Sequence, residues 1–146
     1  MTTALEVLRA KPHQTVYTVA PGAPVFEAVQ LMGQKNVGAL LVMDEGRLVG
    51  IISERDYARK IALLERSSRN TAVREIMSAP VMCVRPPQTS EECMALMTEN
   101  RLRHLPVMEG DRLLGVISIG DLVKGIISEQ QFLIEQLEHY IAGQPA

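Results

Sequence analysis

Aromatic residues are scarce: the 146 residues include no tryptophan, three tyrosines and two phenylalanines. A surface for single-stranded nucleic acid stacks bases on aromatic side chains, so it would be hard to assemble here. An excess of one charge is also missing, because 15 Lys+Arg and 17 Asp+Glu are interspersed and give a formal net charge of −2. That balance lacks the basic footprint of a duplex-binding protein. Nucleic acid is therefore not an expected partner.

The two cysteines, Cys83 and Cys93, lack the spacing of metal ligands and lie in apolar stretches. Such thiols usually behave as small hydrophobic groups, which argues against a disulfide framework or a metal site. Long apolar runs are absent too, since no window approaches the roughly 18 residues of a spanning helix. The N-terminus lacks the basic start and apolar run of a secretory signal. We expect a cytoplasmic protein that does not interact with membranes.

Catalytic motifs are missing as well. None of the three histidines belongs to a metalloprotease pair or a nucleophile–base couple, and no Gly-x-Ser-x-Gly elbow occurs. The glycines form neither a P-loop nor a Gly-x-Gly-x-x-Gly turn. We expect no enzymatic activity and no catalytic cofactor.

What the chain does contain is a duplication. Apolar residues make up 47% and charged residues 22%, enough for a proper core in one domain or two small ones. Shifting the sequence by 65 positions aligns residues 17–61 with 82–126 without a gap, and 15 of the 45 pairs are identical. Random pairing would give roughly three. The chain therefore contains two copies of one structural unit.

Each copy predicts the order β-α-β-β-α. A β-rich run (15–19 or 81–84) precedes a segment with helical apolar spacing, then two apolar runs joined by a tight polar turn, then helical spacing again. One unit of about 50 residues cannot bury both faces of a three-stranded sheet, so the copies should cover each other. The fold class is α/β (α+β), with two units related by a pseudo-twofold axis plus N- and C-terminal helices. The predicted boundaries are 12–66 and 80–127 for the units, 67–79 for a linker with a short helix, and 128–142 for a C-terminal amphipathic helix.

Two local signals mark the segments outside the units. Thr71 is a candidate cap for a short linker helix ending near Met77. Ser128 opens a possible capping box before Phe132, Leu133, Leu137 and Ile141 at helical spacing. That helix either folds back onto its own module or packs across a homodimer, and the sequence favours neither.

One polar motif occurs in both copies, at the point where a strand becomes a helix. It reads Gly50-Ile-Ile-Ser53-Glu-Arg-Asp56 in the first copy and Gly115-Val-Ile-Ser118-Ile-Gly-Asp121 in the second. Ser-x-x-Asp before an apolar helix is typical of a capping box, a purely structural feature that a duplication copies along with everything else. The same atoms also suit a nucleotide, because the helix N-terminus and serine attract phosphate and the carboxylate accepts ribose hydroxyls. The two glycines would let a flat purine approach the strand.

A basic pair distinguishes the second copy, where Arg103-His104 enters an apolar strand and the first copy has Gly38-Ala39. Cationic groups at a strand entry cost desolvation unless solvent or an anion receives them. Solvent at the strand end could receive Arg103, and hydrogen bonds within the protein could satisfy His104. A bound phosphate would account for both residues as well.

Over residues 12–127 the chain resembles a tandem pair of CBS domains, which are named after cystathionine β-synthase; such a pair is also called a Bateman module. Three features carry the resemblance: the duplicated unit, the Gly-h-h-Ser-x-x-Asp junction (h, apolar) and the Arg-His-Leu-Pro-Val segment. The resemblance implies a non-catalytic sensor that binds adenosine-containing ligands such as AMP, ADP, ATP, S-adenosylmethionine or NAD between the units. By position, one site would take Ser53, Asp56, Met82, Leu102, Arg103 and His104. The other would take Ser118, Asp121, Val16, Tyr17, Val37 and Gly38, with Arg55 substituting for the missing basic pair.

The resemblance also implies that the two sites are unequal, that the module forms a homodimer, and that its signal passes to a separate effector protein. The alternative is a ligand-free interaction scaffold whose Ser-x-x-Asp boxes only cap helices and which dimerises through Phe132 and Leu137.

Overall fold

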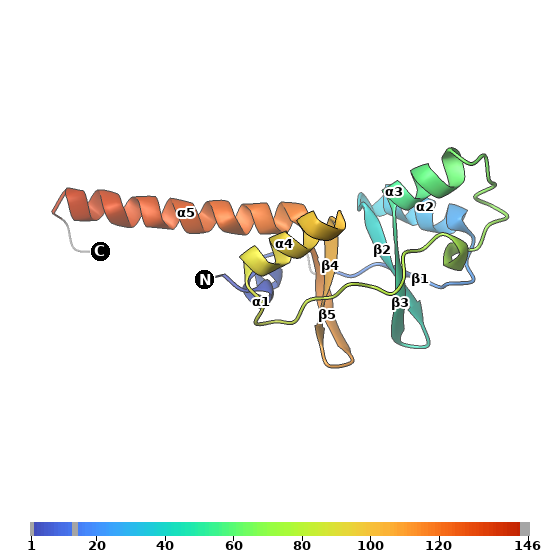
Figure 1. Ribbon diagram of the computed structural model, residues 1–146, viewed down its shortest axis with the longest axis horizontal. Coiled ribbons are helices and arrows are strands. Elements are labelled where there is room, and N and C mark those ends of the chain that lie inside the picture. Colours follow the sequence, from blue (N-terminus) through green and yellow to red (C-terminus); the bar gives the residue numbers. More distant parts are fainter. Residues whose placement is uncertain (1, 13–14, 144–146) are drawn as a thin grey trace. The chain divides into compact units, whose positions relative to one another are not determined.

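The computed structural model describes residues 2–12 and 15–143, which divide into two compact units (Figure 1). The first unit comprises Thr15–Met82. The second comprises the described residues before position 13 together with those from Cys83 onward. The linker therefore belongs to the first unit, and the N-terminal segment belongs to the second.

The first unit has the predicted order of elements. Strand β1 (Thr18–Val19) pairs in parallel with β2 (Ala39–Asp44), and β2 pairs antiparallel with β3 (Arg47–Ser53). Helix α2 (Val25–Lys35) connects β1 to β2, and the short helix α3 (Glu54–Tyr57) continues into the π-helical turn η1 (Ala58–Ala62). The β2–β3 hairpin closes through Glu45 and Gly46, both with positive φ, as a tight turn between right-twisted strands requires.

Residues spaced as predicted form the core of this unit. Val25, Ala28 and Met32 of α2 pack with alternate residues of β2 and with Ile52 of β3. The linker closes the same core through Val73 and Ile76.

The linker helix is the 3-10 turn η2 (Val73–Glu75), close to the predicted position, but its cap differs. Thr71 is buried, and its backbone carbonyl accepts a hydrogen bond from Val25 N. The Glu75 carboxylate instead accepts the N–H of Ala72 at 2.7 Å. The expected capping role of Thr71 was wrong, because this residue ties the linker to the start of α2.

The second unit repeats the plan with a reduced sheet. Strands β4 (His104–Glu109) and β5 (Arg112–Ser118) form an antiparallel hairpin, with α4 (Ser90–Asn100) before it and α5 (Ile119–Ile141) after it. The predicted third strand is only an isolated parallel bridge between Val84 and Val107. In the first unit Leu41 N donates to Tyr17 O, whereas the aligned Pro106 has no N–H to donate. One missing donor thus shortens the ladder.

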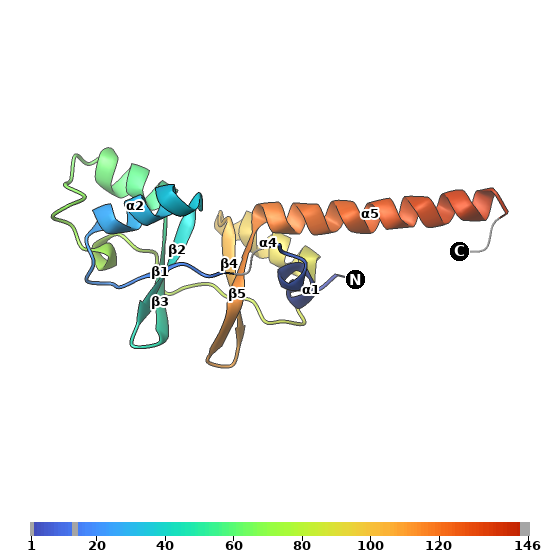
Figure 2. The ribbon, with the colours of Figure 1, turned by 180° about the vertical axis from the view of Figure 1, so that it is seen from behind.

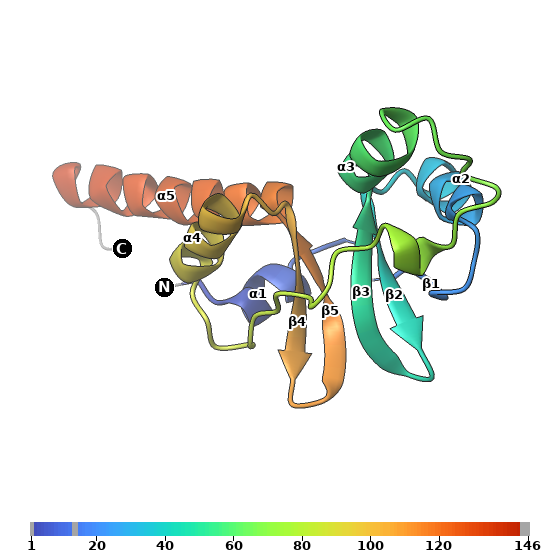
Figure 3. The same ribbon diagram turned by 45° about the vertical axis from the view of Figure 1, so that its right-hand side comes forward.

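The N-terminal helix α1 (Ala4–Arg9) completes the second core. Ala4, Val7 and Leu8 are buried against the hairpin and the helices, and Thr3 caps α1 through Glu6 N. Figure 3 shows α1 next to the β4–β5 hairpin, and within this unit α1 contacts β5. The sequence predicted the helix but not its packing partner.

Helix α5 is one continuous helix of 23 residues that starts at the cap of Ser118. Ser128 lies in its interior, so the expected break and second capping box at this position were wrong. The apolar spacing simply runs on from the unit into the C-terminal stretch, and an interior serine costs little helix stability. Figures 1 and 2 both show the C-terminal half of α5 extending past α1 and α4. Its side chains do not fold back onto the unit, since Leu137 is 60% exposed and Ile141 is 83% exposed.

Candidate functional site

The first junction lies where β3 enters α3. The Ser53 hydroxyl accepts a hydrogen bond from Asp56 N at 3.2 Å, and Asp56 Oδ2 accepts from Ser53 N at 2.9 Å and from Ser53 Oγ at 3.1 Å. This is the complete capping box that the spacing predicted. Each group satisfies an N–H that the helix start would otherwise leave unpaired.

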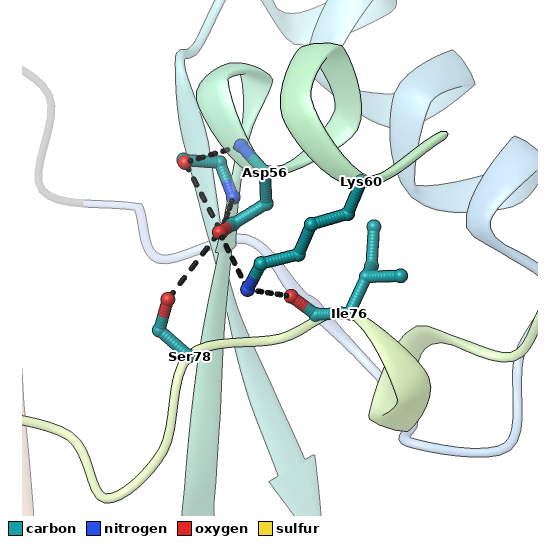
Figure 4. A network of polar contacts seen from close by, with 5 residues as sticks. Asp56, Lys60, Ile76 and Ser78 are labelled. Atoms are coloured by element: carbon teal, nitrogen blue, oxygen red, sulfur yellow. Dashed lines mark hydrogen bonds and ion pairs between the residues drawn. The ribbon is translucent and has the colours of Figure 1, made fainter. Parts of the chain in front are cut away.

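The other carboxylate oxygen of Asp56 is engaged as well. Ser78 Oγ donates to Oδ1 at 3.3 Å, and Lys60 Nζ lies 3.3 Å from the same atom. Lys60 also donates to the carbonyl of Ile76 at 2.8 Å. Figure 4 shows linker residues Ile76 and Ser78 meeting the helix residues around this carboxylate. Asp56 is 9% exposed, so a cation and hydroxyls surround a nearly buried acid.

The second junction has the same capping box and a different surrounding. Ser118 Oγ accepts from Asp121 N at 3.1 Å, and Asp121 Oδ2 accepts from Ser118 N at 2.8 Å. Lys11 Nζ lies 3.0 Å from that same Oδ2 and donates to the carbonyl of Val116 at 2.8 Å. The contacts with Ser118 N and with Lys11 Nζ are both made by the same oxygen, Oδ2.

These contacts set the ionisation of Asp121. Burial raises the pKa of this carboxyl. The Ser118 backbone N–H and the Lys11 ammonium together lower the pKa by more than burial raises it, so the net pKa lies below the usual value. The carboxylate is therefore an ionised hydrogen-bond acceptor at neutral pH.

The two lysines are not copies of each other. Lys60 follows Asp56 by four residues on the same helical segment, and its aligned position in the second copy is Gly125. The second acid instead receives Lys11 from the N-terminal segment, which lies outside the repeat. A duplication copies caps, but it does not explain a lysine reaching each acid from a different part of the chain.

The strand glycines serve a different purpose from the one expected. A Cβ added at Gly50 would overlap Met77, and one added at Gly115 would lie 2.6 Å from Leu8 Cδ1. These glycines make room for the linker and for α1 of their own units. The expectation that they admit a purine was wrong, because side chains of the protein occupy that space.

Backbone contacts bring two further predicted positions to the junctions. The carbonyl of Gly38 accepts from Glu54 N at 3.0 Å, and that of Arg103 accepts from Ile119 N at 2.8 Å, so each predicted entry residue lies at a helix start of its own unit. His104 pairs with Ser118 across the β4–β5 ladder and is half-buried, and Arg103 is exposed.

The remaining predicted residues divide between the units. The first unit also holds Val16, Tyr17 and Val37, which are half-buried, and Arg55 and Met82, which are exposed. Leu102, in the second unit, packs against its core. That residues of both units share a ligand stays a prediction.

Three residues at the junctions were not singled out from the sequence: Lys11, Lys60 and Ser78. The spacing of four between Asp56 and Lys60 is a recognisable helix ion-pair signal. No local pattern connects Lys11 to Asp121, which is 110 positions away.

Among residues 2–12 and 15–143, no group of three or more His, Cys, Asp or Glu could hold a metal ion. Within the same ranges, no helix combines the length and apolar character needed to cross a bilayer.

Comparison with known proteins identifies the repeat. The family model described as "CBS domain" matches residues 5–63 and 73–128. The CBS domain-containing protein CBSX3, mitochondrial, of Arabidopsis thaliana is 43% identical over 124 residues, which are 82% of this chain and 60% of that protein. The chain thus spans less than two thirds of that relative.

Solved structures agree with the fold. A CBS-domain protein from Burkholderia ambifaria MC40-6 is 55% identical, with a TM-score of 0.85 over 88% of this chain and 96% of that one. The CBS domain pair of protein MJ0100, 22% identical, superposes with a TM-score of 0.70 over 80% of this chain and 92% of that one. The MJ0100 structure is a complex with 5′-methylthioadenosine and S-adenosyl-L-methionine.

Proposed function

Because the chain belongs to the CBS domain family and carries a tandem pair of these regulatory domains, we propose that it binds adenosine-containing ligands at its two Ser-x-x-Asp junctions and signals to a separate partner. The ligand class comprises AMP, ADP, ATP and NAD. The aspartate of each junction accepts the ribose hydroxyls, and the serine, the helix N-terminus and nearby cations attract phosphate.

The observation that carries this proposal is the meeting of an acid, a serine hydroxyl and a lysine ammonium at both junctions, with lysines from unrelated positions. An ionised carboxylate offers about four lone-pair positions, and at Asp121 the Ser118 N–H and the Lys11 ammonium meet the same oxygen. Binding of adenosine compounds by the MJ0100 domain pair supports the ligand class.

Calorimetric titration of the intact chain with AMP, ATP and NAD tests the proposal. Wild type should bind at least one of them saturably. Asp56→Asn and Asp121→Asn should each weaken binding about tenfold or more, since hydrogen bonds to a charged group contribute about 1.5–3 kcal/mol. Asp111→Asn, on the exposed β4–β5 turn, is the matched control and should leave affinity unchanged. Absence of binding by wild type, or equal effects of all three substitutions, would refute the proposal.

A second candidate is the ligand-free interaction scaffold. Both capping boxes are complete without a ligand, and α5 presents a set of exposed apolar side chains. The exposed set includes Val123, Ile127, Leu133, Ile134, Leu137 and Ile141. A bound ligand raises the melting temperature by mass action, so the scaffold is favoured only if saturating AMP, ATP and NAD all leave it unchanged.

A further inference from the structure

Lys11 contacts the second junction from outside the duplicated region. An ammonium carries three donors. Within the described residues, one points to the Val116 carbonyl at 2.8 Å and one to Asp121 Oδ2 at 3.0 Å. The lysine is thus held in place by two fixed oxygens and keeps one donor for a third acceptor.

The backbone next to this ammonium is open. Gly120 stands in the first turn of α5 at the position that aligns with Arg55 of the first copy. The nearest atom to a Cβ added there would be Ser118 Oγ, at 3.6 Å. An anion can therefore approach the first turn of α5 at Gly120 without meeting a side chain of that residue.

Asp56, the corresponding acid of the first unit, is contacted by more groups. Both oxygens of Asp56 already accept hydrogen bonds or an ion pair, from Ser53, Ser78 and Lys60. Among the described residues, the contacts of Asp121 come from two residues only, Ser118 and Lys11. Acceptor and donor lie side by side, which suits a ligand that combines a diol with an anionic group.

Resting on the proposed function, we propose that Lys11 is the phosphate-recognition residue of the Asp121 junction and makes that junction selective for phosphorylated adenosine ligands over the neutral nucleoside. The lysine retains its contact with Asp121 Oδ2 while its third donor meets the phosphate. The N-terminal segment then contributes specificity as well as core packing.

The test compares AMP with adenosine by calorimetry on the full chain in an Asp56→Asn background, which isolates the Asp121 junction. The unaltered Lys11 protein should prefer AMP, and Lys11→Met should weaken AMP about tenfold or more while changing adenosine less than threefold. Lys11→Arg should retain most of the preference. Lys124→Met removes an exposed charge from the same helix and should change neither affinity.

The outcomes separate the two claims. If wild type binds none of adenosine, AMP, ATP and NAD, the proposed function itself is refuted. If wild type binds one of them but the Asp56→Asn protein does not bind AMP, the present proposal alone is overturned. Binding of both with equal losses in Lys11→Met shows a merely structural lysine and overturns the present proposal. If Lys11→Met does not fold, the salt dependence of AMP and adenosine binding is measured in the Asp56→Asn protein instead. The preference for AMP over adenosine should fall as ionic strength rises. A preference that does not change with salt overturns the proposal.

Discussion

At Asp121, a backbone N–H and an ammonium share one carboxylate oxygen. Within the described residues, each capping box satisfies its own helix start, so it would form in a purely structural protein as well. What the cap alone does not require is the lysine beside each acid. Lys11 and Lys60, more than the serines, therefore distinguish these junctions from purely structural caps.

The lowered pKa of Asp121 predicts a pH dependence of stability. A carboxyl whose folded pKa is depressed stabilises the fold above its unfolded pKa and loses that contribution as pH falls through the folded value. The free energy of unfolding, measured in urea, should exceed that of Asp121→Asn above about pH 4. The difference should shrink as pH drops further, and a difference constant from pH 7 to pH 3 would contradict the assignment.

The contacts that were predictable from the sequence are those that spacing along the chain determines. Ser-x-x-Asp implies a capping box because residues three apart meet in the first helical turn, and both boxes are present. Prediction failed for Lys11 and for the strand glycines, because tertiary packing determines which side chain fills the space beside a strand. Leu8 and Met77 fill it from segments distant in sequence.

At the scale of elements, one proline and two glycines adjust a common plan. Pro106 removes a ladder donor and reduces the second sheet to two strands with a bridge. Gly115 lets α1 approach β5 closely, as Gly50 lets the linker approach β3. The order β-α-β-β-α was predictable from periodicity, whereas the strand lost to Pro106 required the hydrogen-bond register.

The close approach of α1 predicts that Gly115→Ala is destabilising. Leu8 is 4% exposed and has little room to move, so the added methyl should cost about 1–3 kcal/mol of unfolding free energy. Gly33→Ala is the matched control, because a Cβ there meets nothing within 4 Å, and alanine should stabilise α2 by up to about 1 kcal/mol.

A double-mutant cycle with Leu8→Ala isolates the contact. Gly115→Ala should be much less costly when Leu8 is already truncated, since the methyl then has space. Urea denaturation measures both changes in unfolding free energy. If Gly115→Ala lowers the unfolding free energy equally with Leu8 and with Leu8→Ala, the Leu8 side chain is not what excludes the added methyl.

At the scale of the whole molecule, the continuous α5 changes the basis of the homodimer prediction. Val123, Ile127, Leu133, Ile134, Leu137 and Ile141 share one face at helical spacing. Phe132 and Leu137, which the sequence suggested together, are five residues apart and so point about 140° apart around the helix. One flat interface cannot use both.

The homodimer is therefore predicted to depend on Leu137 and not on Phe132. Light scattering coupled to size exclusion should give twice the 16.1 kDa chain mass for wild type and for Phe132→Glu. Leu137→Glu should give the mass of one chain, because a charge on the apolar face opposes its burial. A monomeric wild type, or identical behaviour of the two variants, would remove α5 as the dimer interface.

Native mass spectrometry of the intact protein, titrated in turn with AMP, ATP and NAD, shows whether the duplicated junctions bind adenosine ligands. We predict mass additions of at least one of these ligands, up to two per chain, that diminish in the variant carrying both Asp56→Asn and Asp121→Asn. Spectra that show only ligand-free protein at millimolar concentrations of all three, or additions equally abundant in the double variant, would contradict this prediction.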